Sequence, residues 1–548
     1  MFHHLIVNRC TFDIVNYFLE EQFLRFEINM SELIAESKLK RFLLYGSEEM
    51  VYFPGCRVQY GYYLGSNLAS LRTLLNQVDK EKIFDWVKIV QNEKLSSHFS
   101  IVPLVVSECC KISGWKEDAL ELALTVLRTD KEFLMFCKFS YEILPDIGTG
   151  PLVAKLIRKW YLKRHYWELV EMVSERPSCY GWCHKDVIRL AKVNSSCPLR
   201  AAAIAYAIGG AELMNQMYGN DEQAEEVVEH LNRVEAFKSE TDPDKAVIEI
   251  GAYLHTINTT NMTLLQNRKV WKALISQMDL VELLARLPTI RKRGFLRCPV
   301  LYSWDPHFVP HLCDRLESLG AVLQSKIRPS RSCIEHQRWK NKSERFCKQL
   351  SRPKPVNEDI LKALKQQLEK ALKKNVRTMT KNITVIVDCH DLSSSYCSYK
   401  RFVQADMAAA VTALYFANAS KNTKVVIFKG TNHQYLQRGT TLDELVNSIG
   451  TDTTACPSTR AIGFYLNPTQ SEILDNDLFI VIGAKIDHED YTKKVDDLRK
   501  ENSRGPKFAF CNLGGIPADR SFEYDKDVLL TSGFDDKICD IISSFSKL

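Results

Sequence analysis

The chain has 548 residues, which is enough for two or more domains with large hydrophobic cores. Apolar residues make up 45% of it and charged residues 26%, as in globular proteins, and the net charge is only +6, so overall charge does not indicate a nucleic-acid-binding protein. The 17 cysteines form no C-x-x-C pair or regular framework, which predicts buried thiols in a reducing compartment. No run of about 20 apolar residues is present. We therefore expect no membrane partner and a cytoplasmic or nuclear location.

The first two thirds of the sequence have helical periodicity. Residues 1–36 predict one or two amphipathic helices without an assigned role. From 37 to 375, helix-length segments are separated by turn signals at Phe53-Pro54-Gly55, Ser113-Gly114, Gly148-Thr149-Gly150, Cys197-Pro198, Gly209-Gly210 and Asp242-Pro243. Helices joined by short connections predict an α-solenoid, in which each helix pair buries its apolar stripe against its neighbours. No fixed-period repeat is visible in the sequence.

Two consecutive predicted helices carry cations on one side and apolar residues on the other. In the first, residues 153–161, these are Lys155, Arg158 and Lys159 against Val153, Ile157, Trp160 and Tyr161. In the second, expected to begin near Cys183, the cations fall at i, i+4 and i+7, and a histidine flanks them: Lys185, Arg189 and Lys192 against Val187, Leu190 and Ala191, with His184 beside the stripe. One such stripe is usually a solvated helix face. Two in succession indicate a basic patch that could hold phosphates.

A third basic segment spans residues 326–354, where lysines and arginines far outnumber the two acids Glu335 and Glu344. It also contains His336, Trp339 and Phe346. Cations interleaved with aromatic rings suit single-stranded RNA, whose bases stack and whose phosphates pair with cations. Prolines near both ends also fit a mobile basic loop, and the two interpretations are compatible.

The pattern changes after a clear helix at residues 357–374, for which Asn357 is the expected N-cap. Short apolar runs then alternate with helical stretches: expected strands at 383–387, 424–428, 478–482 and 507–511, and expected helices at 402–418, 442–449, 488–501 and 535–546. This order predicts a doubly wound parallel α/β sheet. The predicted parts are an N-terminal extension (1–36), a helical module (37–375) and an α/β domain (376–548).

Several short segments resemble the Ro autoantigen family, whose helical module is called TROVE. GWCHKDVIRL (181–190) matches the family segment GW-x-HKD-x-x-RL, and further matches follow in the same order along the chain: RFLLYGSE (41–48), RKWY (158–161), VWKALISQM (270–278), ILKAL (360–364) and SGFDDKICDII (532–542). The resemblance covers about residues 37–548. It implies a ring of HEAT-like helical repeats followed by a von Willebrand factor A-type domain.

The resemblance also implies which residues meet RNA. In the family, the outer face of the ring binds Y RNA stems and the central hole takes single-stranded ends of misfolded small RNAs. His184 falls on the RNA-contacting histidine, and Lys155, Lys185 and Arg189 fall on basic positions. The chain departs from the pattern at residues 174–181, where Arg176 is the only cation, and at Pro151 and Ala154, which replace arginines. Each lost phosphate contact weakens binding, so we expect a lower affinity or a different set of RNAs.

The A-type domain of the family carries an adhesion-type Mg²⁺ site of the form Asp-x-Ser-x-Ser followed by Thr and Asp. Asp388 fills the first position, but in the gap-free register His390 and Leu392 replace the serines and Ala484 replaces the last Asp. Alternative registers use Asp391, Ser393 and Ser395 for the motif and Thr451-Asp452 or Thr454 for the threonine. Because leucine and alanine cannot bind a hard cation, we expect a degraded site with Asp388 as its remnant and no bound metal or other cofactor.

Two other chemistries find little support. Cys179, Cys183, His184 and Cys197 have zinc-ligand types but poor spacing, so buried thiols are the better interpretation. No G-x-S-x-G, H-E-x-x-H or G-x-x-x-x-G-K-[ST] motif is present, so we expect no enzyme.

We therefore expect a non-catalytic, Ro-type ribonucleoprotein component that binds small structured noncoding (Y-like) RNA and takes part in RNA quality control. The expected RNA-binding residues are Lys155, Arg158, Lys159, His184, Lys185, Arg189 and Lys192, with His184 as a pH-sensitive contact. Protein partners are expected at the A-type domain. The alternative is a protein-interaction scaffold that kept the fold and lost RNA binding.

Overall fold

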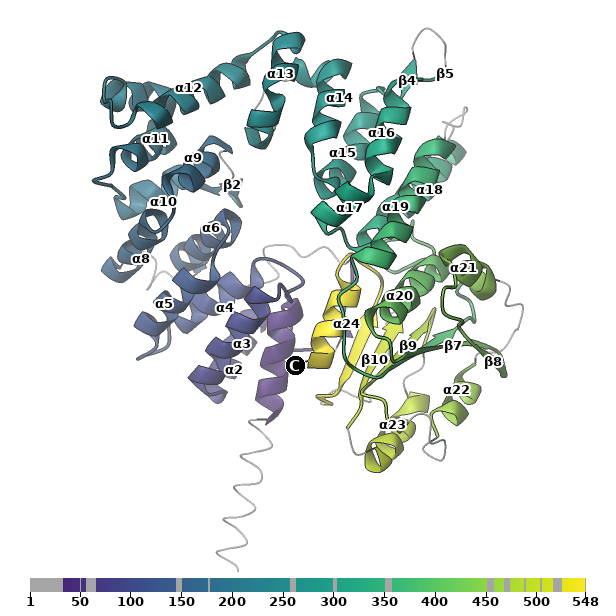
Figure 1. Cartoon of the computed structure of the whole chain (residues 1–548). Helices are drawn as coiled ribbons and strands as arrows, with labels where there is room; N and C mark the ends of the chain where they lie inside the picture. Colours follow the sequence, from purple (N-terminus) through teal and green to yellow (C-terminus); the bar gives the residue numbers. More distant parts are fainter. Residues whose placement is uncertain are drawn as a thin grey trace, which may run out of the picture.

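The computed structural model describes residues 33–547, apart from residues 50, 56–65, 144–149, 176–177, 257–262, 299–302, 350–356, 451–457, 468–473, 487–488, 503–504 and 516–524. Figure 1 shows an arc of helices whose two ends meet at an α/β domain. Of the predicted N-terminal extension, only residues 33–36 are described, and they begin a helix over residues 33–45. No helix in the described ranges is long and apolar enough to cross a membrane.

The helical module follows the predicted pattern of short, consecutive helices. After the helix at 33–45, its helices are α2 (Ser66–Gln77), α3 (Lys80–Asn92), α4 (Ile101–Cys109), α5 (Lys116–Val126), α6 (Asp130–Lys138) with the π-helical η2 (Phe139–Ile143), α8 (Pro151–Leu162), α9 (Tyr166–Glu175), α10 (His184–Ala191), α11 (Pro198–Tyr218), α12 (Glu225–Ser239), α13 (Pro243–Tyr253), α14 (Arg268–Gln277), α15 (Leu280–Lys292), α16 (Phe308–Glu317), α17 (Leu319–Ser325), α18 (Pro329–Gln349) and α19 (Glu358–Lys374). Two short hairpins interrupt them, β2–β3 (Ser178–Cys179, Trp182–Cys183) and β4–β5 (Arg297–Cys298, Ser303–Trp304).

The helices at the start of the module stack in two layers. Helices α3, α5, α8 and α10 contact one another in succession, and Figure 1 shows α5, α8 and α10 on the outer side of the ring, with α4, α6 and α9 further in. Each helix buries its apolar stripe against the next pair, as in other solenoids. The HEAT-like arrangement expected from the resemblance is therefore present.

A 36-residue period becomes visible in the hydrogen bonds between these helix pairs. The guanidinium of Arg128 donates to Asn92 Oδ1 (2.8 Å), that of Arg164 to the Arg128 carbonyl (2.6 Å), and that of Arg200 to the Arg164 carbonyl (3.0 Å), each across 36 residues. We call this series of arginines the arginine ladder. The repeat is not visible in the sequence, because only one residue in each 36-residue unit is shared and the apolar residues around it differ from unit to unit.

The second module is a seven-stranded sheet with helices on both faces. Its elements are β6 (Ile383–Asp388), α20 (Ala405–Ala419), β7 (Thr423–Lys429), β8 (Asn432–Tyr435), α21 (Leu442–Gly450), α22 (Thr459–Tyr465), β9 (Leu478–Gly483), α23 (Glu489–Glu501), β10 (Lys507–Asn512), β11 (Val528–Ser532) and α24 (Ile538–Lys547). The four predicted strands pair in parallel at its centre, which confirms the doubly wound sheet. The edge strand β8 is antiparallel to β7.

One strand of this sheet comes from the start of the chain. The strand order is β1-β11-β10-β9-β6-β7-β8, and β1 (Val51–Tyr52) pairs in parallel with β11. Residues 51–52 lie inside the range predicted as helical, so the module limits at 37–375 and 376–548 do not separate the two folding units completely. A strand of two residues is too short to show a hydrophobic period, so the sequence could not predict it. It is a strand because it pairs with β11, which lies far away in the sequence.

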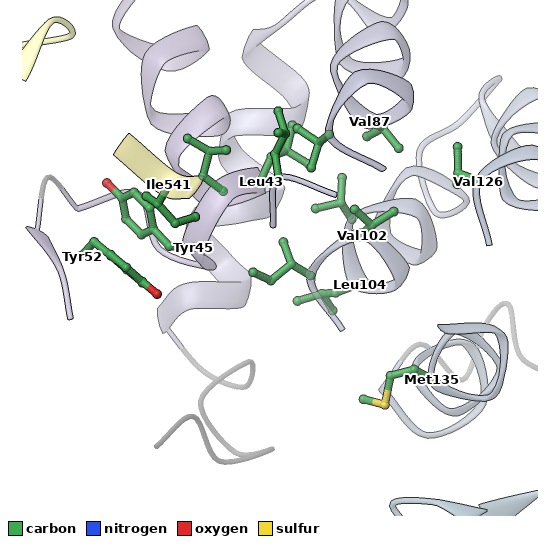
Figure 2. Packing of buried hydrophobic residues seen from close by; sticks show 14 of the residues in the cluster. Leu43, Tyr45, Tyr52, Val87, Val102, Leu104, Val126, Met135 and Ile541 are labelled. Atoms are coloured by element: carbon green, nitrogen blue, oxygen red, sulfur yellow. The ribbon is translucent and has the colours of Figure 1, made fainter. Parts of the chain in front are cut away.

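The C-terminal segment joins both ends of the helical arc. Figure 2 shows Ile541 of α24 among side chains of the N-terminal helix and the turn after it, including Leu43 and Tyr45. The Tyr52 hydroxyl donates to the Asp535 carboxylate (2.5 Å). At the other end of the arc, Arg328 pairs with Asp540 and the Ser330 hydroxyl donates to the Asp536 carbonyl. The A-type domain therefore closes the ring.

Candidate nucleic-acid interface

Helices α8 and α10 contact each other, and each carries exposed cations. Helix α8 begins with Pro151 at its first position, where a missing N–H costs nothing, and α10 begins after Cys183, whose backbone N–H donates to the Asp186 carboxylate (3.0 Å). The predicted apolar face of α8 is buried: Val153, Ile157, Trp160 and Tyr161. In α10 the buried residues are His184, Val187, Ile188 and Ala191; Leu190, which we predicted to be buried, is 38% exposed.

Six of the seven predicted RNA-binding residues are exposed on these two helices and their ends. We call this surface the basic face: Lys155, Arg158, Lys159, Lys185, Arg189 and Lys192. Among the described residues, no carboxylate lies within ion-pair distance of Lys155, Arg158, Lys185 or Lys192. The Arg189 guanidinium donates to the Ile208 carbonyl at 3.4 Å, a long contact that leaves most of its N–H groups to solvent. Unpaired, exposed cations on adjacent helices are suited to binding phosphates.

One cation of the basic face forms an ion pair with an acid. The Lys159 ammonium is 2.8 Å from the carboxylate of Glu121, which lies on the neighbouring helix α5. The hydrogen bond from Lys159, with the nearby charges of Lys163 and Lys155, lowers the pKa of Glu121. Lys159 is therefore partly neutralised in the free protein. The same electrostatic contact identifies Lys163, exposed after the end of α8, as a cation of this surface that the sequence analysis missed.

His184 lies behind the basic face instead of beside it. Its side chain is 3% exposed, and Nδ1 lies 2.8 Å from the Tyr161 hydroxyl. Burial lowers the pKa of His184 to about 4, so the ring is neutral at physiological pH. Its Nε2 has no hydrogen-bond partner within the described residues. The predicted position beside the exposed stripe is wrong, because the first residue of α10 is buried against Tyr161 of α8. A pH-sensitive contact near neutrality is not supported.

The third basic segment differs from its predicted form. The described part of residues 326–354 is mainly the helix α18, so the interpretation as a mobile loop is wrong. Arg331 and Arg338 both pair with the buried carboxylate of Glu335, at 3.0 and 2.6 Å. Trp339 is 7% exposed and lies under the Arg291 guanidinium. Helix α18 packs against α19 and α20, and the two rings of this segment whose side chains are described, His336 and Trp339, are buried and do not offer a surface for base stacking. The side chain of Phe346 lies outside the described part of the structure.

Only some positions of the predicted metal site lie within the described residues, and few of these carry an oxygen ligand. Asp388 ends β6 and is largely buried, its carboxylate accepts the His390 backbone N–H (3.1 Å), and burial raises its pKa. Leu392 is fully buried and Ala484 is 1% exposed, so neither position supplies an oxygen ligand. Thr451, Asp452 and Thr454 lie outside the described residues. Among the described residues, Asp388 is the only position of the gap-free register that supplies an oxygen ligand, whereas Mg²⁺ prefers several.

The cysteine cluster gives no metal geometry either. The Cys183 thiol donates to the Asp186 carboxylate, and Cys179 Sγ contacts Met135 Sδ at 3.8 Å. No group of three or more His, Cys, Asp or Glu side chains in the described ranges is arranged to hold a metal ion. All described free cysteines are buried except Cys183 and Cys197, which are half-buried.

The fold defines a class: a ring of paired helices closed by an A-type α/β domain, with a basic surface on its outer layer. No family model matches the sequence. The crystal structure of the Deinococcus radiodurans Ro (Rsr) protein superposes with a TM-score of 0.71, at 17% sequence identity, over 94% of this chain and 99% of that chain. The resemblance to the Ro family is thus confirmed at the level of the whole fold.

Proposed function

We propose that this chain is a divergent Ro-type protein that binds RNA without catalysis. The observation that carries the proposal is the basic face, because it places exposed cations from two packed helices on the outer layer of a Ro fold. We predicted these helices to be consecutive in the sequence, but α9 lies between α8 and α10. Phosphates of a structured RNA stem would pair with Lys155, Arg158, Lys185 and Arg189. Lys192 and Lys163 extend the surface at the ends of the helices.

The proposed ligands are small structured noncoding RNAs of the Y type, with single-stranded ends of defective RNAs as a second class for quality control. The proposed location is the cytoplasm or the nucleus. Neither metal nor any other cofactor takes part in RNA binding, because the cations of the basic face supply the charge. The A-type domain is proposed as the docking surface for protein partners.

The first test removes two central cations without disturbing the buried side of α10. Lys185→Ala/Arg189→Ala should weaken RNA binding and reduce the slope of log Kd against log salt by roughly two, one for each lost phosphate contact. A matched control is Lys493→Ala/Lys500→Ala, which removes two exposed cations of α23 in the A-type domain. Thermal unfolding should show the double variants to be folded.

The RNA itself can be identified by crosslinking and sequencing from the protein's own cells at two salt concentrations. A discrete set of small RNAs that is lost at higher salt is the expected result. Background RNA at both salts, or unchanged affinity in the folded Lys185→Ala/Arg189→Ala variant, would overturn the proposal. Either outcome would favour the protein-interaction scaffold. The loss of RNA binding would then be explained by Pro151 and Ala154, which replace arginines of the family, and by the acid Glu121.

A further inference from the structure

A cavity of about 370 Å³ lies at the joint between the two modules, away from the basic face. Its walls come from the last turns of α19, the end of α20, strand β7 and the segment 436–442 that leads into α21; Figure 1 shows these helices next to one another. An ion pair between Lys365 and Asp443 connects α19 to α21 beside it. The volume falls in the range of small-molecule sites in proteins.

Three cations and one acid lie around the cavity. Lys373 comes from α19, Lys421 from the turn after α20, and Arg438 from the loop before α21, whereas Glu369 is the only carboxylate among the lining residues. Arg438 is held in place because its guanidinium donates to the Lys421 carbonyl at 2.8 Å. Lys373 and Lys421 have no carboxylate partner among the described residues. The residues that line the cavity therefore carry an excess of positive charge, on three exposed side chains.

The N-terminus of α21 contributes little to this charge. The Thr441 backbone N–H donates to the Glu444 carboxylate (2.8 Å), and the Glu444 N–H donates to the Thr441 hydroxyl (3.3 Å). This reciprocal cap satisfies the first turn and places an acid next to it. Affinity for an anion must then come from the three side-chain cations.

The floor of the cavity is apolar. Leu372, Leu414 and Val425 are 3%, 7% and 4% exposed, and the half-buried Leu436 lies beside them. An inorganic anion would leave this floor uncovered. An apolar body placed on it would gain burial energy, while a charged group at the rim met the cations.

From this combination we infer that the cavity binds a small organic anion, with an apolar or aromatic body about the size of a nucleoside and one phosphate or carboxylate group. The ligand would contact α19 of the helical ring and α20 and β7 of the A-type domain at the same time. Its occupancy would therefore stiffen the joint between the modules. The inference is independent of RNA binding at α8 and α10.

The test is isothermal titration calorimetry of the full-length, nuclease-treated protein with three probes: a panel of nucleoside monophosphates, a panel of aryl carboxylates and inorganic phosphate. At least one organic panel should bind more tightly than inorganic phosphate, and the panel that binds distinguishes a nucleotide from a carboxylate ligand. Lys373→Ala/Arg438→Ala should weaken that binding about tenfold. Glu369→Gln should strengthen it about twofold to threefold, because it removes the one opposing charge.

Two controls separate this site from general charge and from the basic face. Lys374→Ala changes the next residue of α19, which is exposed and does not line the cavity, and should bind normally. Lys185→Ala/Arg189→Ala should also bind the small anion normally, even if it has lost RNA. The inference is overturned if no probe binds at millimolar concentration, if inorganic phosphate binds as tightly as the organic anions, or if Lys374→Ala and Lys373→Ala/Arg438→Ala behave alike.

Discussion

Two parts of this chain look equally basic in sequence and have opposite environments in the structure. The basic face on α8 and α10 holds its cations in solvent, whereas the described part of α18 places its arginines at the joint between α19 and α20. All three helices are amphipathic and rich in cations, so their composition does not distinguish the two regions. The difference lies in Glu335, which is 3% exposed and pairs with Arg331 and Arg338.

This comparison shows what makes a cation available to a ligand. On the basic face only Lys159 has an acidic partner among the described residues, and that partner, Glu121, is itself exposed. In α18 one buried carboxylate satisfies two guanidinium groups before any ligand arrives. Charge density along a sequence therefore predicts a binding surface only where the neighbouring helices leave the charges unpaired.

Among the substitutions that test this comparison, Glu335→Ala should have the largest effect. It leaves two arginines of α18 without their counterion in a mostly buried setting, and should lower the free energy of unfolding by about 3 kcal/mol. RNA affinity measured below the unfolding transition should not change. Urea unfolding followed by circular dichroism measures the first effect, and a filter-binding assay the second.

The matched control is Glu229→Ala, which removes an acid from an exposed i,i+4 pair with Arg233 on α12. Exposed pairs contribute less than about 1 kcal/mol, so its effect should be small. If Glu335→Ala were no more destabilising than this control, or if it altered RNA binding, α18 would belong with the surfaces that are open to ligands.

A second prediction concerns the boundary between the basic face and the core behind it. Because the folded pKa of His184, about 4, lies below the ordinary value of 6.5, the unfolded chain takes up a proton that the folded chain excludes. Stability should therefore fall as the pH drops from 6.5 toward 4, by roughly 2–3 kcal/mol from this residue. His184→Gln should reduce that loss, as measured by urea unfolding across the pH range.

RNA affinity should not follow the same titration between pH 8 and pH 6. An exposed histidine replaced in the same way, His165→Gln, is the control for the chemistry of the substitution. A steep pH dependence of RNA binding in this range that disappeared in His184→Gln and persisted in His165→Gln would place the imidazole at the RNA after all.

The smallest expected effect is on RNA affinity, and it tests whether Lys159 belongs to the RNA-binding part of the basic face. Glu121→Gln removes the acid that pairs with Lys159, and should strengthen RNA binding about twofold to fourfold with a salt slope steeper by up to roughly one. Glu117→Gln, exposed on the same helix, is the control. Equal affinity of the two variants, measured at low salt where the electrostatic difference is largest, would mean that RNA does not approach α5 and Lys159.

Elements with a regular hydrophobic pattern along their own sequence were predicted correctly. The four apolar strands β6, β7, β9 and β10 and the helix α19 with its cap at Asn357 confirm their predicted form, since each combines a continuous apolar pattern with a local boundary signal. The same holds for the buried side of α8. On α10, Val187 and Ala191 are buried as predicted, but Leu190 is exposed and Ile188, for which no environment was predicted, is buried, because eight residues make little more than two turns and define the buried side poorly.

The features that were not predicted depend on residues far away in the sequence. Strand β1 exists because Val51 and Tyr52 meet β11, and the arginine ladder because Arg128, Arg164 and Arg200 each reach back across 36 residues. Strands β8 and β11 and helix α22 were not predicted; β8 is short, its residues are exposed and it has little apolar content. Local sequence carries no record of such pairings.

The sequence by itself determined the two-module plan, the four central strands and the two cationic stripes, because hydrophobic spacing fixes which side of each element is buried. Only the tertiary structure decided which of the charged residues remain in solvent. The position of neighbouring helices buries His184, pairs Glu335 with two arginines, and brings Lys373, Lys421 and Arg438 from three elements around one cavity. Electrostatic availability depends on distances between segments remote in sequence, and the fold alone sets those distances.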